Sequence, residues 1–373
     1  MAPSIASDPK ASSSALTSSS SVKQQHSQPS VSAASIFTAA YLDHLNAQLA
    51  GLEPQKIIEW ALVSLPGLYQ TTAFGLTGLV ILDMISKISQ ERQATAAASP
   101  SPPSPASTAT ASSSAAPAVT ADGDSDDSDS ASASSSSFAS ASASTPPSPH
   151  LVPLIFIDTL HHFPETLNLA TTAAERYSAP LHIYRPAGSL TTADEFASTH
   201  GANLWSTDPD SYDYLVKVEP AQRAYAELGV RAVFTGRRRT QRGARSAIPI
   251  LELDSSAPGV LKVNALAAWD YDAVWAYVRQ NNVPYNALID KGYKSVGDVH
   301  STLPTAPGEG ERDGRWKGQE KTECGLHKDY FKMRAQFLAA QKKKAAAAAA
   351  AASAEGARTE GLQQAAEAAP VGA

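Results

Sequence analysis

Apolar and polar positions repeat along the chain with two periods, one typical of helices and one of buried strands. Residues 36–49 and 54–63 carry apolar side chains three and four positions apart, which predicts two amphipathic helices. The second begins at Pro54, a residue suited to the first turn of a helix, and Pro66-Gly67 ends it.

Short β-branched and apolar runs then alternate with further helical patterns. The predicted strands are 68–72, 151–157, 181–184, 231–235 and 261–263, and the predicted helices between and after them are 77–90, 163–177, 218–228 and 270–280. Because strands and helices alternate, we expect an α/β domain with a mainly parallel sheet.

Three segments have compositions that cannot bury enough apolar surface to offset the entropy of ordering. They are the Ser/Ala-rich tail 1–34, the Ser/Ala/Pro/Asp insert 94–149 and the Lys/Ala-rich tail 336–373. We expect all three to be without packed structure. Without them about 250 residues remain, enough for one domain with a good core. That domain comprises 35–93 and 150–300, with a separate C-terminal segment at 301–335.

Charge and cysteine content exclude several classes of protein. The formal net charge of −6 argues against a nucleic-acid binder. The longest apolar run, near 76–85, is too short and interrupted to span a membrane. A single cysteine supplies no disulfide framework for secretion, and the N-terminus lacks the apolar region of a signal peptide. We therefore expect a cytoplasmic protein.

Cys324 is the only cysteine in the chain. One thiol cannot form an internal disulfide or supply an iron–sulfur cluster, so any chemistry here is that of a thiolate nucleophile. Lys321, His327 and Arg315 favour the thiolate, whereas Glu323 opposes it. The competing interpretation is a small buried hydrophobe, the common state of a free cysteine, but its flanks are charged and polar.

Two loops carry residues suited to anions. The turn between strand 68–72 and helix 77–90 contains hydroxyls and glycines, a pattern that presents backbone N–H groups to phosphate or sulfate but is common in α/β proteins. Residues 237–245 hold five arginines directly after a predicted buried strand. A loop pinned at both ends suits a polyanionic ligand, although a solvated charge run or a nuclear localisation signal has the same composition.

Asp158 follows a predicted central strand, where acids of open α/β sheets contact ligands. Capping of the next turn is an equally good explanation for an Asp at this position. Residues 292–327 are rich in glycine and charge and poor in long apolar runs. We expect that segment, which contains Cys324, to be mobile and to lie outside the core.

Taken together these segments resemble the thioredoxin-dependent branch of the phosphoadenylyl-sulfate (PAPS) reductases. The resemblance rests on the Thr71–Gly78 loop, DTLHHFPET (158–166), TGRRRTQRGAR (235–245), GYKSVGDVHST (292–302), GRWKG (314–318) and KTECGLH (321–327). It implies an adenine nucleotide α-hydrolase-like fold, a doubly wound parallel sheet. The chain departs from many relatives at Thr71, Thr72 and Ala73, where they have serines, and at Leu160, where they have glycine.

The resemblance also implies a role for each matching residue. Cys324 would be the nucleophile, with His327 and Arg315 beside it. The residues that would bind the substrate are Thr71, Thr72, Phe74, Gly75, Thr77, Gly78, Asp158, Thr159, Arg238, Arg239, Gln241 and Arg245. No metal is implied.

The implied reaction reduces 3′-phosphoadenylyl sulfate to sulfite and adenosine 3′,5′-bisphosphate through a Cys324 S-sulfonate. With one cysteine per chain, an external thioredoxin would supply the electrons, with no bound cofactor or iron–sulfur cluster. A homodimer is also implied. Two alternatives on the same fold are an adenylyltransferase, which would not need the cysteine, and a non-catalytic nucleotide sensor, which would bind nucleotide without releasing sulfite. A purely structural role for the cysteine is the third.

Overall fold

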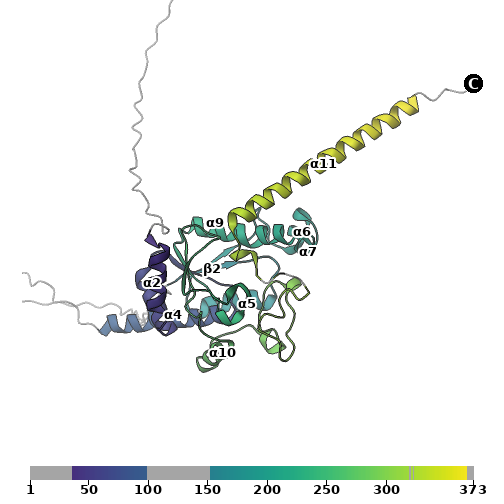
Figure 1. Ribbon diagram of the computed structural model, residues 1–373. Coiled ribbons are helices and arrows are strands. Elements are labelled where there is room, and N and C mark those ends of the chain that lie inside the picture. Colours follow the sequence, from purple (N-terminus) through teal and green to yellow (C-terminus); the bar gives the residue numbers. More distant parts are fainter. Residues whose placement is uncertain (1–35, 99–151, 319–320, 322, 368–373) are drawn as a thin grey trace, which may run out of the picture.

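The computed structural model describes residues 36–98, 152–318, 321 and 323–367 (Figure 1). The predicted tail 1–34 and residues 99–149 of the predicted insert lie outside the described residues.

One six-stranded sheet organises the chain, and five of its strands run parallel. In chain order the strands are β1 (Leu68–Thr71), β2 (Leu154–Ile157), β3 (Leu181–Tyr184), β4 (Ala232–Phe234), β5 (Leu251–Leu253) and β6 (Leu261–Val263). Their order across the sheet is β3-β2-β1-β4-β6-β5, and only β5, at one edge, is antiparallel. The predicted mainly parallel α/β sheet is therefore confirmed.

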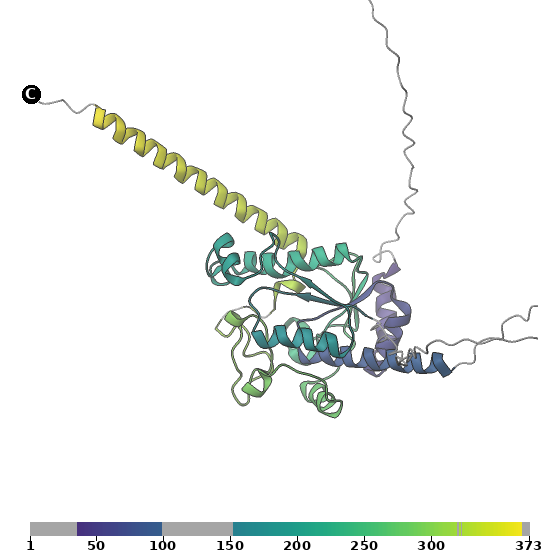
Figure 2. The same cartoon turned by 180° about the vertical axis from the view of Figure 1, so that it is seen from behind.

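Helices cover both faces of the sheet (Figures 1 and 2). The α-helices are α2 (Ala39–Leu49), α3 (Pro54–Ser64), α4 (Leu76–Ala98), α5 (Pro164–Arg176), α6 (Ala193–His200), α7 (Leu204–Thr207), α8 (Pro209–Asp213), α9 (Glu219–Glu227), α10 (Tyr271–Gln280) and α11 (Tyr330–Glu367). A π-helical turn, η1 (Tyr214–Val218), joins α8 to α9, and short 3-10 turns include η2 (Arg239–Gln241), η3 (Gly243–Arg245), η4 (Ile289–Lys291), η5 (Val299–Ser301) and η6 (Gly325–His327).

The alternation of side chains along the strands divides the core into two layers. Leu154 and Phe156 of β2 pack in one cluster with α3, α4, α5 and α10. Ile155 and Ile157, the residues between and after them, pack in a second cluster with α9. Successive strand residues point to opposite faces, so this strand is apolar at every position because both faces are covered.

The edge strand β5 is covered by a side chain from α2. Asn46 donates its Nδ2 hydrogen to the Leu251 carbonyl at 2.9 Å and accepts the Leu251 N–H at 2.8 Å. An edge strand otherwise presents unpaired backbone groups, and the two bonds from Asn46 satisfy one residue of this edge.

The apolar pattern of the sequence does not predict most of the helical region before β4. It predicts a helix at 218–228 but none of α6, α7, α8 or η1. These elements are short, and their buried aromatic residues Phe196 and Tyr212 pack into a small satellite cluster of their own. Such short helices have too few turns to show a helical period.

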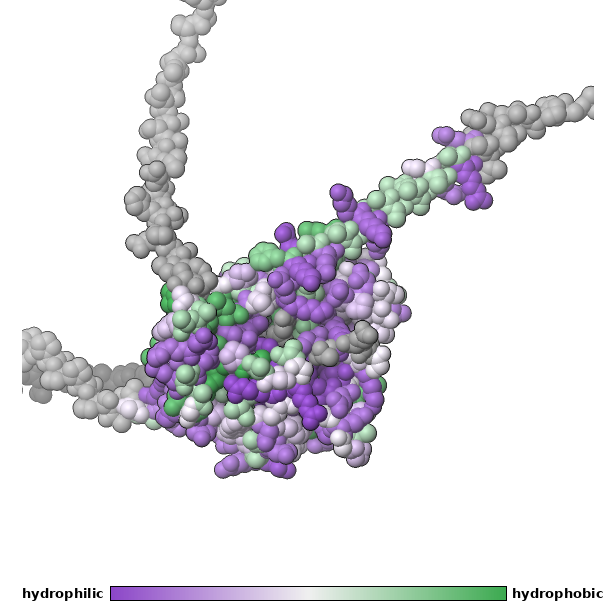
Figure 3. All heavy atoms as spheres, in the orientation of Figure 1, coloured by the Kyte–Doolittle hydropathy of each residue, from purple (hydrophilic) through white to green (hydrophobic). Residues whose placement is uncertain are grey.

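Two segments predicted to lack structure are partly helical. Helix α4 continues to Ala98, so residues 94–98 of the predicted insert are helical. Helix α11 continues to Glu367 through most of the predicted tail, projecting from the body (Figures 1 and 3). A composition that cannot be buried can still form a helix, because alanine has the highest intrinsic helix propensity and favours a helix without packing.

The segment 292–327, expected to lie outside the core, is also packed more closely than predicted. Asp298, Thr302 and Trp316 are all buried. The segment has no long apolar runs. Hydrogen bonds between polar groups and cation–π contacts, such as Arg315 over the Trp316 ring, fix it instead. No helix among the described residues is long and apolar enough to cross a membrane.

Helix α11 allows a test of which part of it stabilises the fold. Met333 is buried against Tyr214 and Val218, whereas 341–360 are exposed. Ending the chain after Lys344 should change the free energy of unfolding by no more than about 0.5 kcal/mol. Met333→Ala should cost about 2–5 kcal/mol. Urea denaturation followed by fluorescence measures both. A truncated chain as destabilised as Met333→Ala would contradict this division of the helix.

Candidate active site

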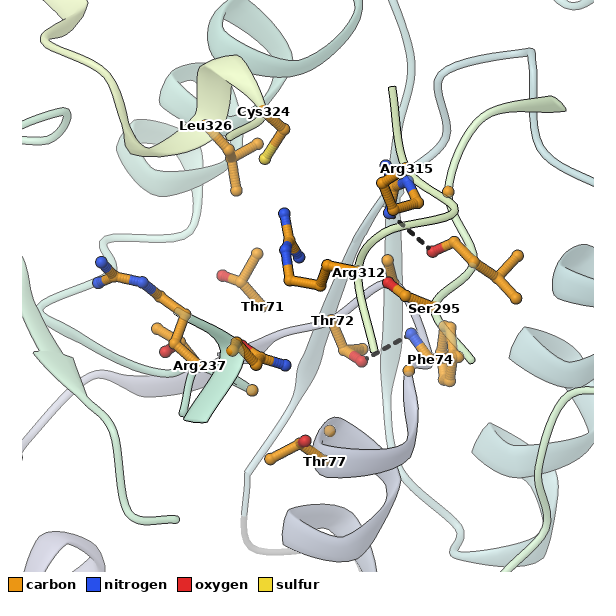
Figure 4. A pocket seen from close by; sticks show the side chains of 18 of the residues that line it. Thr71, Thr72, Phe74, Thr77, Arg237, Ser295, Arg312, Arg315, Cys324 and Leu326 are labelled. Atoms are coloured by element: carbon orange, nitrogen blue, oxygen red, sulfur yellow. Dashed lines mark hydrogen bonds between the residues drawn. The ribbon is translucent and has the colours of Figure 1, made fainter. Parts of the chain in front are cut away.

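A cavity of about 260 Å³ lies at the carboxyl ends of the central strands (Figure 4). Its lining includes the segments after β1, β2 and β4, the stretch 294–298, and Cys324. From β1 the chain proceeds to β2 on one side, while β4 lies on the other side of β1. In open α/β sheets ligands bind at the point where the strand order reverses, which is where this cavity lies.

The loop between β1 and α4 forms one wall of the cavity. Thr72 Oγ1 accepts the Phe74 N–H at 2.9 Å, and Phe74 has a left-handed φ of 55°. The buried Phe74 ring packs edge-on against Phe156, which holds the turn in place. The amides at the start of α4 have no acceptor within the helix and carry its positive dipole end. The loop is therefore built to receive an anion.

All six predicted substrate-binding residues of this loop line the cavity, namely Thr71, Thr72, Phe74, Gly75, Thr77 and Gly78. Gln70 donates to the Gly78 carbonyl at 2.6 Å, which fixes the first turn of α4 against β1. Thr159, from the loop after β2, lines the cavity too and donates to Asp298 Oδ1 at 2.8 Å.

The arginine loop, residues 237–245, lines the cavity with residues that differ in part from those predicted. Gln241 and Arg245 line it, and so does Arg237, which was not predicted. Arg242 is exposed. The structure does not place Arg238 or Arg239 in the cavity wall.

Arg238 is fully buried, and its guanidinium is already paired. It donates to Thr77 Oγ1 at 2.9 Å and forms an ion pair with Glu311 at 2.5 Å. Arg239 donates to the Ile248 carbonyl at 2.9 Å. Both sets of contacts hold the arginine loop in shape.

Asp158 likewise makes protein contacts in place of cavity contacts. Its two oxygens accept the Leu160 N–H at 3.0 Å and the Arg185 Nε–H at 2.8 Å. Of the two explanations that the sequence left open, this geometry corresponds to turn capping.

Cys324 is half-buried at the cavity rim, at the start of the short turn η6 (Figure 4). Arg312 and Arg315 line the same cavity, and Lys217 approaches it from η1. Negative charge on Cys324 would interact with all three cations. His327 belongs to the same turn, and its side chain lies outside what the structure describes.

The residue before the cysteine ties this segment to the arginine loop. Glu323 accepts two hydrogen bonds from Arg245, at 2.6 and 2.7 Å. Burial by itself would raise the pKa of Glu323, but Arg245 and then Arg312 outweigh it and hold the pKa below its ordinary value. Glu323 is therefore ionised at neutral pH, and its carboxylate is paired with the guanidinium of Arg245, a residue of the cavity wall.

A buried ionic network lies beneath the cysteine. Lys217 contacts Asp298 at 2.6 Å and Asp213 at 3.1 Å. Burial alone would lower the pKa of Lys217, but the two carboxylates, Asp298 first, raise it above the ordinary value. Lys217 therefore remains a cation inside the site.

Several cavity residues escaped the sequence analysis. They are Lys217, Arg237, Lys294, Asp298 and Arg312. Asp298 and Lys294 lie within GYKSVGDVHST, a motif whose charged residues had no predicted role. Lys217 sits in a helical stretch whose apolar pattern gives no sign that it faces a ligand.

Three buried nitrogens in the cavity wall have no hydrogen-bond partner among the described residues. They belong to Arg237 (Nε), Arg315 (Nε) and His162 (Nδ1). Buried polar atoms are normally paired, so unpaired ones beside a cavity point to a polar ligand. No group of three or more His, Cys, Asp or Glu side chains in the described part of the chain could hold a metal ion.

The fold and site define the class: a doubly wound α/β protein whose switch-point cavity is lined by the start of a helix and by a cysteine. Residues 67–304 match the family model described as "Phosphoadenosine phosphosulfate reductase domain". The chain is 46% identical over 304 residues to a phosphoadenosine phosphosulfate reductase of Emericella nidulans, covering 81% of this chain and 80% of that one. It is 44% identical to the enzyme of that name from Saccharomyces cerevisiae, covering 78% and 91%.

A solved structure agrees with these relatives. The crystal structure of the PAPS reductase from Candida auris, a phosphate complex, is 43% identical, covers 72% of this chain and 98% of its own, and gives a TM-score of 0.51. The chain belongs to the phosphoadenosine phosphosulfate reductase family, whose members are oxidoreductases acting on a sulfur group. Its fold is accordingly the adenine nucleotide α-hydrolase-like one that the sequence predicts.

Gly75 and Gly78, in the loop between β1 and α4 and the first turn of α4 (together the anion loop), differ in the space around them. A Cβ on Gly78 would lie 2.8 Å from Thr72 Oγ1, whereas a Cβ on Gly75 would meet nothing within 4 Å among the described residues. Gly78→Ala should therefore lower the free energy of unfolding by about 1–3 kcal/mol, since Thr72 has to move. Gly75→Ala should change it by less than about 0.5 kcal/mol. Urea denaturation compares the two, and equal losses would contradict the packing described.

Proposed function

We propose that this chain reduces 3′-phosphoadenylyl sulfate to sulfite and adenosine 3′,5′-bisphosphate in assimilatory sulfate reduction, with reduced thioredoxin as the electron donor. The observation that carries the proposal is that Cys324 lies on the same cavity as the helix-terminus anion loop and the cationic groups Arg245, Arg312 and Arg315. Membership of the reductase family supports the substrate.

In the proposed first step the Cys324 thiolate attacks the sulfur of the bound sulfate group. The bond between that sulfur and the bridging phosphate oxygen breaks, and the nucleotide phosphate leaves with the electron pair. Charge grows on the leaving oxygen, where the amides at the start of α4 and the arginines can stabilise it. The products of this step are a cysteine S-sulfonate and adenosine 3′,5′-bisphosphate.

In the proposed second step a thioredoxin thiolate attacks Cys324 Sγ and expels sulfite. A second thioredoxin thiol then resolves the mixed disulfide, which restores the Cys324 thiol and leaves oxidised thioredoxin. Because the chain has one cysteine, it cannot complete this step alone. A reducing compartment such as the cytoplasm keeps such a thiol available.

The binding site is proposed to hold both anionic ends of the substrate. Arg245 is paired with Glu323, so an entering anion would compete with this carboxylate for the guanidinium. Thr71, Thr72 and the amides of 74–78 would hold the phosphosulfate, with Thr159 and Gln241 nearby. A homodimer is the assembly that the family resemblance suggests.

Arg245→Ala should weaken binding of adenosine 3′,5′-bisphosphate far more than Arg242→Ala. Arg245 is buried in the cavity wall, whereas Arg242, three residues earlier in the same loop, is exposed. Loss of a charge-assisted contact should cost on the order of 1.5–3 kcal/mol. Isothermal titration calorimetry measures both variants. Equal affinity losses would remove Arg245 from the binding site.

Cys324→Ser should abolish sulfite production while nucleotide affinity remains. The hydroxyl preserves the shape of the site, but it is scarcely ionised at neutral pH and attacks sulfur poorly. Wild type incubated with 3′-phosphoadenylyl sulfate and no thioredoxin should gain one sulfonate on Cys324, read by intact mass spectrometry and peptide mapping.

Reduced thioredoxin should then remove that group and release a matching amount of sulfite. Turnover by Cys324→Ser would instead favour another enzyme on this fold, such as an adenylyltransferase. Nucleotide binding with neither sulfonation nor sulfite release would favour a sensor.

A further inference from the structure

Asp213, the last residue of α8, is a fully buried carboxylate whose partners bracket the cysteine. Its Oδ2 accepts the Gly325 N–H at 3.0 Å and contacts Lys321 Nζ at 2.5 Å. Its Oδ1 contacts Lys217 Nζ at 3.1 Å. Lys321 and Gly325 lie three residues before and one residue after Cys324, more than a hundred positions from Asp213.

At Asp213 and Gly325 two segments of the chain, the end of α8 and the cysteine segment, approach each other closely. A Cβ on Gly325 would lie 2.7 Å from the Asp213 Cβ, a separation that real structures do not tolerate. Gly325 is absent from the described glycines with positive φ, so the requirement here is for space and not for an unusual backbone conformation. Glycine at this position lets the cysteine segment sit directly on α8.

Asp213 keeps its charge despite its burial. Burial would raise the pKa of Asp213, but Lys217 and then Lys321 outweigh it and lower the pKa below its ordinary value. The same Lys217 contacts Asp298 and lines the cavity, so the anchor for the cysteine segment and the cavity wall share one buried ion network. Displacing the segment would leave Asp213 without Lys321 and the Gly325 N–H without Asp213, and losing the partners of a buried carboxylate costs free energy.

We propose that Asp213 is a positioning residue that docks the Cys324 segment over the cavity by holding Lys321 and the Gly325 amide. It acts through Cys324 and does not touch the substrate. On the other side of the cysteine, the Glu323–Arg245 pair ties the same segment to the arginine loop. With both contacts made, the thiol is held between α8 and the arginine loop. This proposal rests on the proposed function, in which Cys324 is the nucleophile.

Docking of the Cys324 thiol and binding of the nucleotide can be perturbed separately by substitution. Asp213→Asn keeps the shape but loses the charge that holds Lys321 and Lys217. Gly325→Ala keeps the charge but forces the segment away from α8. Asp210→Asn is the matched control, because Asp210 lies on the same helix and pairs with Lys328 of the same segment at 3.0 Å, but that pair is exposed. Exposed pairs contribute little.

The first measurement is the single-turnover rate of Cys324 sulfonation by 3′-phosphoadenylyl sulfate, followed by mass spectrometry. Asp213→Asn and Gly325→Ala should each slow it about tenfold to a hundredfold, since small misplacements of reacting groups have effects of this size. Their affinities for adenosine 3′,5′-bisphosphate should stay within about threefold of wild type, and Asp210→Asn should match wild type in both. The double variant Asp213→Asn/Gly325→Ala should be no slower than the worse single one, because both act on one contact.

The second measurement is the rate at which iodoacetamide alkylates Cys324 in the folded protein without substrate. Both variants should be alkylated several-fold faster than wild type, because an undocked thiol is more accessible. Sulfonation at the wild-type rate in Asp213→Asn, or a parallel loss of sulfonation and nucleotide affinity, would overturn the positioning role. If wild type is never sulfonated, the proposed function fails, and unchanged alkylation in both variants would overturn the docking itself.

Discussion

Positive charge is gathered at one end of the sheet, and the folded state is stable only if carboxylates neutralise that charge. The cavity wall includes Lys217, Arg237, Arg245, Arg312 and Arg315, although the chain as a whole carries a net charge of −6. Buried cations are stable only when paired. Arg237 pairs with Glu252, Arg245 with Glu323, and Lys217 with two aspartates. The positions of these carboxylates therefore determine how distant segments come together.

The C-terminal segment 301–335 also supplies two glutamates that tie it to the arginine loop. Glu311 pairs with Arg238, and Glu323 pairs with Arg245. Both glutamates precede the cysteine in the chain, and the Glu323 pair holds the residue next to Cys324 against the arginine loop. In the proposed function, an anionic ligand in the cavity would offer Arg245 the negative charge that Glu323 offers it. The proposed substrate and the cysteine segment are thus linked through a shared partner, Arg245, in addition to the proposed attack by Cys324.

Helix α4 has a role in both the fold and the proposed chemistry. Its apolar residues, Leu79 to Ile85, fill the core beneath the sheet, while its first turn faces the cavity. The hydrogen bond from Gln70 to the Gly78 carbonyl fixes that turn against β1. A helix held so firmly by its core can present its amides without rearrangement, which is what electrostatic stabilisation requires.

Local pattern was enough to predict the five parallel strands, the longer helices and the loops at their ends. Residues such as Thr72, Thr159 and Arg245 follow apolar runs, and because parallel strands share one carboxyl edge, these residues were bound to meet there. Cys324 could be singled out because it is the only thiol and its flanks are charged. Even the helical tail could have been predicted from the propensity of its alanines.

The tertiary structure alone decided which charges face the ligand cavity and which hold the fold together. Arg238 and Arg245 look alike in sequence, yet one is buried against Thr77 and Glu311 while the other lines the cavity. Asp213 stands in a short helix with no motif around it, and its meeting with Gly325 depends on how α8 packs. Pairing between charges that are distant in sequence follows from the packing of whole elements, so the local spacing of apolar and polar residues cannot predict it.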